Sequence, residues 1–200
     1  SVKRIKTNCR PNVKDIHIVF CIDVSSSMHQ FSQKNILDSI NQVIKEQQNN
    51  SNCLCNNKLT IIKFGSDVNI IHNYINLNVF NKLEYNEIYP NGTTSLYDAI
   101  GIGLNQFKKD EDDIFMILTD GHENTSKKET IYTIRSKLEN AIQKNILVKY
   151  LGGGYDAIRI GMDMGFSEGS CLSFSNNDEG FHNALNSLSS SLSRHRTNEN

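Results

Sequence analysis

Short apolar segments alternate with amphipathic ones along almost the whole chain. Three segments are apolar at nearly every position: IHIVFCID at 16–23, FMILTDG at 115–121 and ILVKYLGGG at 146–154. Such segments are buried on both faces, as are the central strands of a parallel sheet. Two further segments, 58–65 and 69–75, flank the dipeptide Ser66-Asp67 and predict an antiparallel hairpin at the sheet edge. The segment 171–175 predicts a short last strand.

Helices are predicted between and after these strands. Four of them show a one-sided apolar stripe at helical spacing: Ile36, Leu37, Ile40, Val43 and Ile44; Leu96, Ala99, Ile100, Gly103, Leu104 and Phe107; Ile131, Ile134, Leu138 and Ile142; and Phe181, Ala184, Leu185, Leu188 and Leu192. A shorter helix is expected from Asp156 to Met164. This order of elements predicts an α/β fold with a three-layer, doubly wound (Rossmann-like) and mostly parallel sheet, one antiparallel edge strand, and helices on both faces.

Length and charge define the expected domain organisation and exclude some partners. The 200 residues suffice for one α/β domain. We expect this domain at 15–194, after a basic N-terminal arm at 1–14 that carries Lys3, Arg4, Lys6 and Arg10, and before a tail at 195–200. The formal net charge of -1 argues against nucleic-acid binding. No apolar run reaches the roughly 20 residues of a membrane span, so membrane insertion is not expected.

Cysteine usage bears on the expected compartment. The chain contains 5 cysteines, an odd number, scattered along the sequence. Because secreted disulfide frameworks normally use even numbers, we expect reduced thiols in an intracellular, cytoplasmic setting and no secretory signal. Cys53 and Cys55 have no second Cys or His pair nearby, so we interpret them as loop residues and not as zinc ligands.

Oxygen-bearing side chains follow the first predicted strand at every second position. If the strand continues through Asp23 and then enters a loop, Asp23, Ser25 and Ser27 share one side of the chain. In a doubly wound sheet, ligands bind beyond the carboxyl ends of the strands. Asp120 ends the strand at 115–120, and Thr94 precedes a predicted helix, so both are expected at the same edge.

These five residues suit a divalent cation that prefers hard oxygen ligands. Asp23 and Asp120 supply two negative charges and Ser25, Ser27 and Thr94 supply hydroxyls, a set that favours Mg²⁺ or Mn²⁺. Five protein groups leave room for one more ligand on a six-coordinate ion, which an Asp or Glu of a partner protein can supply. In the alternative interpretation the hydroxyls cap helices and Asp120 binds backbone groups.

The pattern Asp-x-Ser-x-Ser, with a distant Thr and a distant Asp, resembles the metal-ion-dependent adhesion site of von Willebrand factor type A domains. DVSSS, GTTSLYDAI and LTDG carry this resemblance, which extends from about residue 15 to 194. All five motif positions are filled, and Thr94 is chosen over Thr93 because of its spacing to SLYDAI. The segments TDGHENTSKKET and YLGGGYDAIRIGMDMGF are similar to free-standing intracellular members.

The resemblance implies a non-enzymatic module that binds a protein partner through a divalent cation. The loops 28–31, 91–93 and 122–126 are expected to set specificity, and nothing in the sequence specifies the oligomeric state. The resemblance also implies that ligand binding shifts the last helix.

Two other functions remain open. The first is a metal-dependent phosphoryl-transfer enzyme or hydrolase with Asp23 or Ser25 as nucleophile and His29 or His122 as base. A phosphoryl site needs Lys or Arg beside the metal to take up charge, and the loops DVSSSMHQF, NGTTSLYD and TDGHENTS contain neither. The second is dinucleotide binding, since Gly152-x-Gly154-x-x-Ala157 follows a strand and precedes a helix. That motif normally opens the first βαβ unit, whereas here it lies late in the chain.

Overall fold

The computed structural model describes residues 15–50, 56–107, 113–175 and 177–197. The predicted basic arm at 1–14, Cys53 and Cys55, and the last three residues of the predicted tail lie outside the described residues. Cys21 and Cys171 are buried free thiols. No helix in the described part of the chain combines the length and the apolar character that a membrane crossing requires.

The described residues form one six-stranded sheet in the order β3-β2-β1-β4-β5-β6. Its strands are β1 (His17–Asp23), β2 (Lys58–Phe64), β3 (Val68–Asn76), β4 (Ile114–Thr119), β5 (Leu147–Gly153) and β6 (Cys171–Phe174). All neighbouring pairs are parallel except β2 and β3, which form the antiparallel edge hairpin. β1 and β4 are buried at every position, as their continuous apolar sequences predict.

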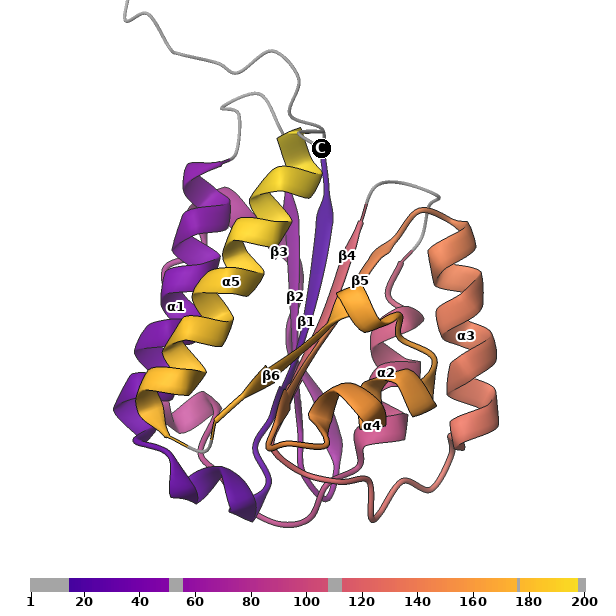
Figure 1. The fold of residues 1–200 in the computed structure, drawn as a ribbon. Helices are drawn as coiled ribbons and strands as arrows, with labels where there is room; N and C mark the ends of the chain where they lie inside the picture. Colours follow the sequence, from indigo (N-terminus) through magenta and orange to yellow (C-terminus); the bar gives the residue numbers. More distant parts are fainter. Residues whose placement is uncertain (1–14, 51–55, 108–112, 176, 198–200) are drawn as a thin grey trace, which may run out of the picture.

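Helices cover both faces of the sheet and complete a three-layer α/β fold (Figure 1). The helices are α1 (Gln33–Asn49), α2 (Leu96–Leu104), α3 (Ile131–Gln143), α4 (Ala157–Met164) and α5 (Asp178–Thr197). α1 and α5 pack on one face around a core that includes Phe20, Ile40 and Leu188. α2, α3 and α4 pack on the opposite face. The predicted fold class and the predicted order of elements are therefore confirmed.

Two helix ends differ from the sequence-based expectation. α2 ends at Leu104, so Phe107, which continues the apolar stripe, lies beyond the helix and packs against the ring of His17. α5 continues to Thr197, past the domain end expected at Arg194. The buried Arg196 donates a hydrogen bond from Nη1 to the carbonyl oxygen of Gln47 in α1. Helix ends are imprecise in a sequence-based prediction, because the last turn of a helix frays or tightens.

The topology places several chain segments at one edge of the sheet. β1 connects to β2 on one side, whereas its other neighbour is β4, so the strand order reverses between β1 and β4. The carboxyl ends of β1 and β4 lie at the lower edge of the view in Figure 1, next to the 3-10 helix η1 (Ser26–Gln30). This switch point is where ligands bind in doubly wound sheets.

Candidate metal centre

The carboxyl end of β1 carries the first part of the oxygen cluster. Asp23 is the last residue of β1, and its side chain is almost completely buried. Its Oδ1 atom accepts a hydrogen bond of 2.7 Å from the backbone N–H of Ser25. The Oγ atoms of Ser25 and Ser27 lie 3.0 Å apart. The alternating positions in the sequence thus bring these three side chains to one point.

Asp120 joins this cluster from the neighbouring strand, directly after the end of β4. Ser27 donates a hydrogen bond of 2.6 Å from Oγ to Oδ1 of Asp120, and Gln30 donates one of 2.6 Å from Nε2 to Oδ2. Ser27 and Gln30 are exposed, and Asp120 is partly exposed. One carboxylate of the cluster is therefore buried and the other lies at the solvent boundary.

Thr94 approaches the cluster from the loop before α2. A Cβ atom on Gly121 would lie 3.1 Å from Oγ1 of Thr94 and 3.7 Å from Oδ2 of Asp23. These two oxygens therefore lie beside the same stretch of backbone, where a side chain would crowd the hydroxyl of Thr94. Thr94 is buried, whereas Thr93 is exposed and bonds through its hydroxyl to Ser66. The geometry thus favours Thr94 over Thr93, as does the spacing in the sequence.

Asp23 is an under-stabilised buried carboxylate. Burial raises its pKa to about 6, hydrogen bonds from Ser25 and Thr119 oppose this rise, and the nearby charge of Asp120 adds to it. Oγ1 of Thr119 donates the second of these bonds, at 2.5 Å to Oδ2. Among the described residues, no Lys, Arg or His side chain forms an ion pair with Asp23 or Asp120. A buried charge without a counter-charge is costly, and a bound cation would remove that cost.

The donor set fits a hard divalent cation. Two carboxylates and three hydroxyls converge here, and these are the ligands that Mg²⁺ and Mn²⁺ prefer. Within the described residues, no group of three or more His, Cys, Asp or Glu side chains is arranged to hold a metal. A metal at this edge therefore depends on the hydroxyls as much as on the carboxylates, which argues against a zinc or copper site of the usual nitrogen and sulfur type.

Helix capping does not account for these hydroxyls. Ser25 occupies the N-cap position of η1, but its side chain makes no capping hydrogen bond there. Ser95, and not Thr94, is the N-cap residue of α2. The long helix α1 is capped by Ser32, whose side chain accepts a hydrogen bond from the N–H of Asn35. The hydroxyls of the cluster are thus left for another role.

Three further residues support the site and were not identified from the sequence as supporting residues. Thr119 donates to Asp23, and Gln30 donates to Asp120. Asn124 accepts a hydrogen bond from the backbone N–H of Thr94 on Oδ1, at 2.9 Å. Of these, only Gln30 and Asn124 fall in loops that the sequence assigns to partner contact. Their bonds join segments far apart in the chain, for which hydrophobic periodicity carries no signal.

The glycine motif after β5 has a packing explanation. A Cβ atom on Gly152 would lie 2.6 Å from Cβ of Ala157, the first residue of α4. Glycine at this position therefore lets α4 pack closely against the sheet. This accounts for the first glycine of Gly152-x-Gly154-x-x-Ala157 without a dinucleotide.

The two histidines near the site, His29 and His122, contact residues outside the oxygen cluster. The ring of His29 packs edge-on against the ring of Tyr89, with centroids 5.7 Å apart. His122 is exposed and lines a pocket of about 200 Å³ with Tyr97 and Asp163. Neither ring forms a hydrogen bond with Ser25 or Asp23 among the described contacts.

Known structures with a similar fold come from several kinds of protein. One is a mussel byssus protein, proximal thread matrix protein 1, in a structure whose metal-ion-dependent adhesion site (MIDAS) motif is occupied by zinc. It shares 11% identity with this chain at a TM-score of 0.69, over 90% of this chain and 46% of that one. The pilus adhesin SpaC from Lactobacillus rhamnosus GG shares 14% identity at a TM-score of 0.70, over 94% of this chain and 31% of that one. The ArnB paralog VWA2 from Sulfolobus acidocaldarius shares 21% identity at a TM-score of 0.60, over 87% of this chain and 45% of that one.

This chain spans less than half the length of each of these structures, and at such identities the likeness shows the fold. No curated protein matches the sequence. The sequence model of the von Willebrand factor type A domain matches residues 17–195, which include every strand and helix described above except the last two residues of α5. The chain therefore belongs to the von Willebrand factor type A domain family.

Proposed function

We propose that this domain binds a protein partner through a divalent cation, Mg²⁺ or Mn²⁺, held by Asp23, Ser25, Ser27, Thr94 and Asp120. The single observation that carries the proposal is the buried carboxylate of Asp23, which lies among hydroxyls and has no cationic partner among the described residues. When bound, the ion would supply the positive charge that attracts a carboxylate oxygen of the partner.

Each residue of the cluster has a distinct role in this proposal. Asp23 provides buried negative charge, and the N–H of Ser25 and the hydroxyl of Thr119 hold its orientation. Ser25, Ser27 and Thr94 offer neutral oxygens, so that two carboxylates only balance the charge of a divalent ion. Asp120 provides the second charge at the solvent boundary, where a partner can approach.

Binding without catalysis is favoured over the two alternatives. Phosphoryl transfer needs Lys or Arg to neutralise charge beside the metal, and within the described part of the chain no Lys or Arg forms an ion pair with Asp23 or Asp120. His29 packs on Tyr89, which is not the position of a base for Ser25 or Asp23. The close contact of Gly152 with Ala157 supports a packing role for the glycine motif and argues against dinucleotide binding.

Titration calorimetry with Mn²⁺ tests the metal site. We expect one site on the wild-type domain that is lost in Asp23→Ala and in Asp120→Ala. Asp156→Ala is a matched control, because Asp156 is an exposed acid that follows β5 at the same sheet edge and forms an ion pair with Arg159. Equal binding by the wild-type domain and Asp23→Ala would refute the proposed site.

A pull-down tests the partner. We expect a protein retained in Mg²⁺ to be released by EDTA and to be absent when the bait is Asp23→Ala. Blocking of the retained protein's Asp and Glu side chains should abolish its binding, because its carboxylate would complete the coordination. Retention that is unchanged in EDTA would argue against a metal-dependent contact.

A further inference from the structure

Asn124 holds the backbone of Thr94 at two points. Its side-chain Oδ1 atom accepts a hydrogen bond from the backbone N–H of Thr94 at 2.9 Å, and its backbone N–H donates one to the carbonyl oxygen of Thr94 at 3.1 Å. Asn124 follows Gly121, the residue whose missing side chain leaves room for the hydroxyl of Thr94. The position of Thr94 relative to the end of β4 is therefore determined by the loop that follows Asp120.

The same loop caps the first turn of α2. The N-cap Ser95 makes no side-chain capping bond, so the free N–H groups of this turn need acceptors from elsewhere. Oε2 of Glu123 accepts the N–H of Tyr97 at 2.8 Å, and Oγ of Ser126 accepts the N–H of Asp98 at 3.0 Å. Glu123 also accepts the N–H groups of Thr125 and Ser126, which fixes its carboxylate in place.

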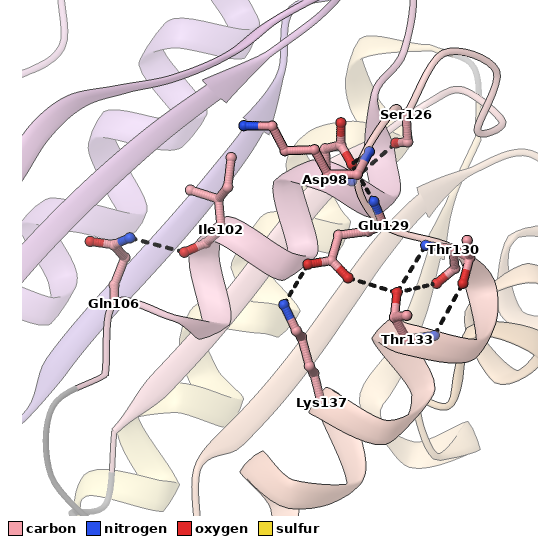
Figure 2. A network of polar contacts seen from close by, with 9 residues as sticks. Asp98, Ile102, Gln106, Ser126, Glu129, Thr130, Thr133 and Lys137 are labelled. Atoms are coloured by element: carbon pink, nitrogen blue, oxygen red, sulfur yellow. Dashed lines mark hydrogen bonds and ion pairs between the residues drawn. The ribbon is translucent and has the colours of Figure 1, made fainter.

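α2 caps the loop in return. The carboxylate of Asp98 accepts the backbone N–H groups of Lys127, Lys128 and Glu129 at 2.9, 3.0 and 2.8 Å. Figure 2 shows Asp98 on α2 beneath this loop, with Ser126 on one side and Glu129 on the other. Each segment thus satisfies the backbone donors that the other leaves free. The pairing locks α2, and Thr94 just before it, onto the loop that begins at Asp120.

We propose that Glu123 and Asn124 are positioning residues, which form a clamp that holds the hydroxyl of Thr94 in place for the cation without contacting the cation, while Asp98 stabilises the loop that carries them. This inference rests on the proposed metal site and explains why the segments GTTSLYDAI and TDGHENTSKKET accompany it. Residues that hydrogen-bond metal ligands orient them, and their loss typically lowers metal affinity about 10–100-fold.

Two variants and one control test the clamp. Asn124→Ala removes the acceptor of the Thr94 N–H, and Glu123→Gln replaces the acceptor of the Tyr97 N–H with an amide group of the same shape. We expect each to raise the Mn²⁺ dissociation constant about 10-fold. Glu129→Gln is the control, because the side chain of Glu129 bonds to Lys137 and Thr133 of α3 (Figure 2). Glu129→Gln should lower the free energy of unfolding but leave the Mn²⁺ affinity within about twofold of wild type.

A metal-free measurement completes the test. In EDTA, hydrogen exchange at the amides of Thr94 and Tyr97 should accelerate about 10-fold or more in Asn124→Ala and Glu123→Gln respectively, and not in Glu129→Gln. If the wild-type domain binds Mn²⁺ and both clamp variants bind it equally well, the clamp is refuted while the metal site stands. If the wild-type domain binds no Mn²⁺, the proposed function itself fails. An equal loss of affinity in Glu129→Gln would also overturn the clamp, because general destabilisation would then explain the effect.

Discussion

Asp23 and Asp98 are two buried carboxylates whose pKa values are shifted in opposite directions. Asp23 is 2% exposed and Asp98 is 8% exposed, so both lose most of their hydration. Burial raises the pKa of Asp23 to about 6. Burial acts in the same direction on Asp98, but the N–H groups of Lys127, Glu129 and Lys128 outweigh it and lower the pKa of Asp98. The contrast therefore lies in the donors and in the nearby charges, since Lys128 lowers the pKa of Asp98 and Asp120 raises that of Asp23.

The difference separates a structural carboxylate from one that is available to bind a cation. The charge of Asp98 is stabilised by three backbone donors, and its removal would leave those donors without an acceptor. The charge of Asp23 receives fewer donors and faces a second carboxylate. A cation bound at Asp23 would be stabilised by a carboxylate charge that no group of the described protein neutralises.

The largest expected effect comes from removal of the structural carboxylate. Asp98→Ala should lower the free energy of unfolding by about 2–3 kcal/mol, because three N–H groups lose a charged acceptor and water replaces it only in part. Urea denaturation in EDTA at pH 7 measures this loss. Asp98→Asn should lose less, since its carbonyl oxygen can still accept. A change below about 0.5 kcal/mol in Asp98→Ala would remove the contrast with Asp23.

The opposite result is expected when the charge of Asp23 is removed. A pKa raised from 3.8 to about 6 corresponds to roughly 3 kcal/mol of unfavourable energy for the ionised form. Asp23→Asn should therefore stabilise the metal-free domain at pH 7 by about 1–2 kcal/mol, after loss of part of its hydrogen bonding. The same urea denaturation shows the gain, and added Mg²⁺ should stabilise only the wild-type protein. Destabilisation by Asp23→Asn in EDTA would mean that the carboxylate has a structural role like that of Asp98.

The pH dependence follows from the same pKa. Because the folded state holds a proton on Asp23 more tightly than the unfolded state, the metal-free domain should gain about 1.4 kcal/mol between pH 7 and pH 5 from this group. Thermal or urea denaturation of the wild-type domain and Asp23→Asn isolates this contribution, which the variant lacks. Proton competition acts in the reverse sense on the metal, so the apparent Mn²⁺ affinity should be about tenfold weaker at pH 5. A Mn²⁺ affinity that does not change over this range would show that Asp23 is not a ligand.

Hydrophobic periodicity was sufficient to predict the fold. β1 and β4 are buried on both faces, and their unbroken apolar sequences indicate this directly. The grouping of Asp23, Ser25 and Asp120 at one edge follows from the topology, since parallel strands end together. The proposed positions of Asp23 and Asp120 could thus be predicted from the sequence, because both lie at the carboxyl ends of buried strands.

The supporting contacts could not be predicted in this way. Asn124 and Thr94 are 30 residues apart, and their bonds depend on how two loops pack. Asp98 was part of a family-like segment, but nothing in its spacing indicates that it binds the backbone of the segment 127–129. The stripe that led to Phe107 overran α2 for a similar reason, since Phe107 lies beyond the helix, where its ring packs against the ring of His17.

The smallest expected effect concerns the second carboxylate of the cluster, Asp120. Gln30 donates to its Oδ2 atom at 2.6 Å, but Gln30 is exposed and Asp120 is only partly buried, so water can replace the lost bond. Gln30→Ala should therefore change the free energy of unfolding by less than about 0.5 kcal/mol and the Mn²⁺ affinity by less than about twofold. Denaturation and titration calorimetry at pH 7 measure both quantities. A loss comparable to that of Asp98→Ala would show that Asp120 depends on protein donors, and the solvent boundary of the site would then lie beyond Gln30.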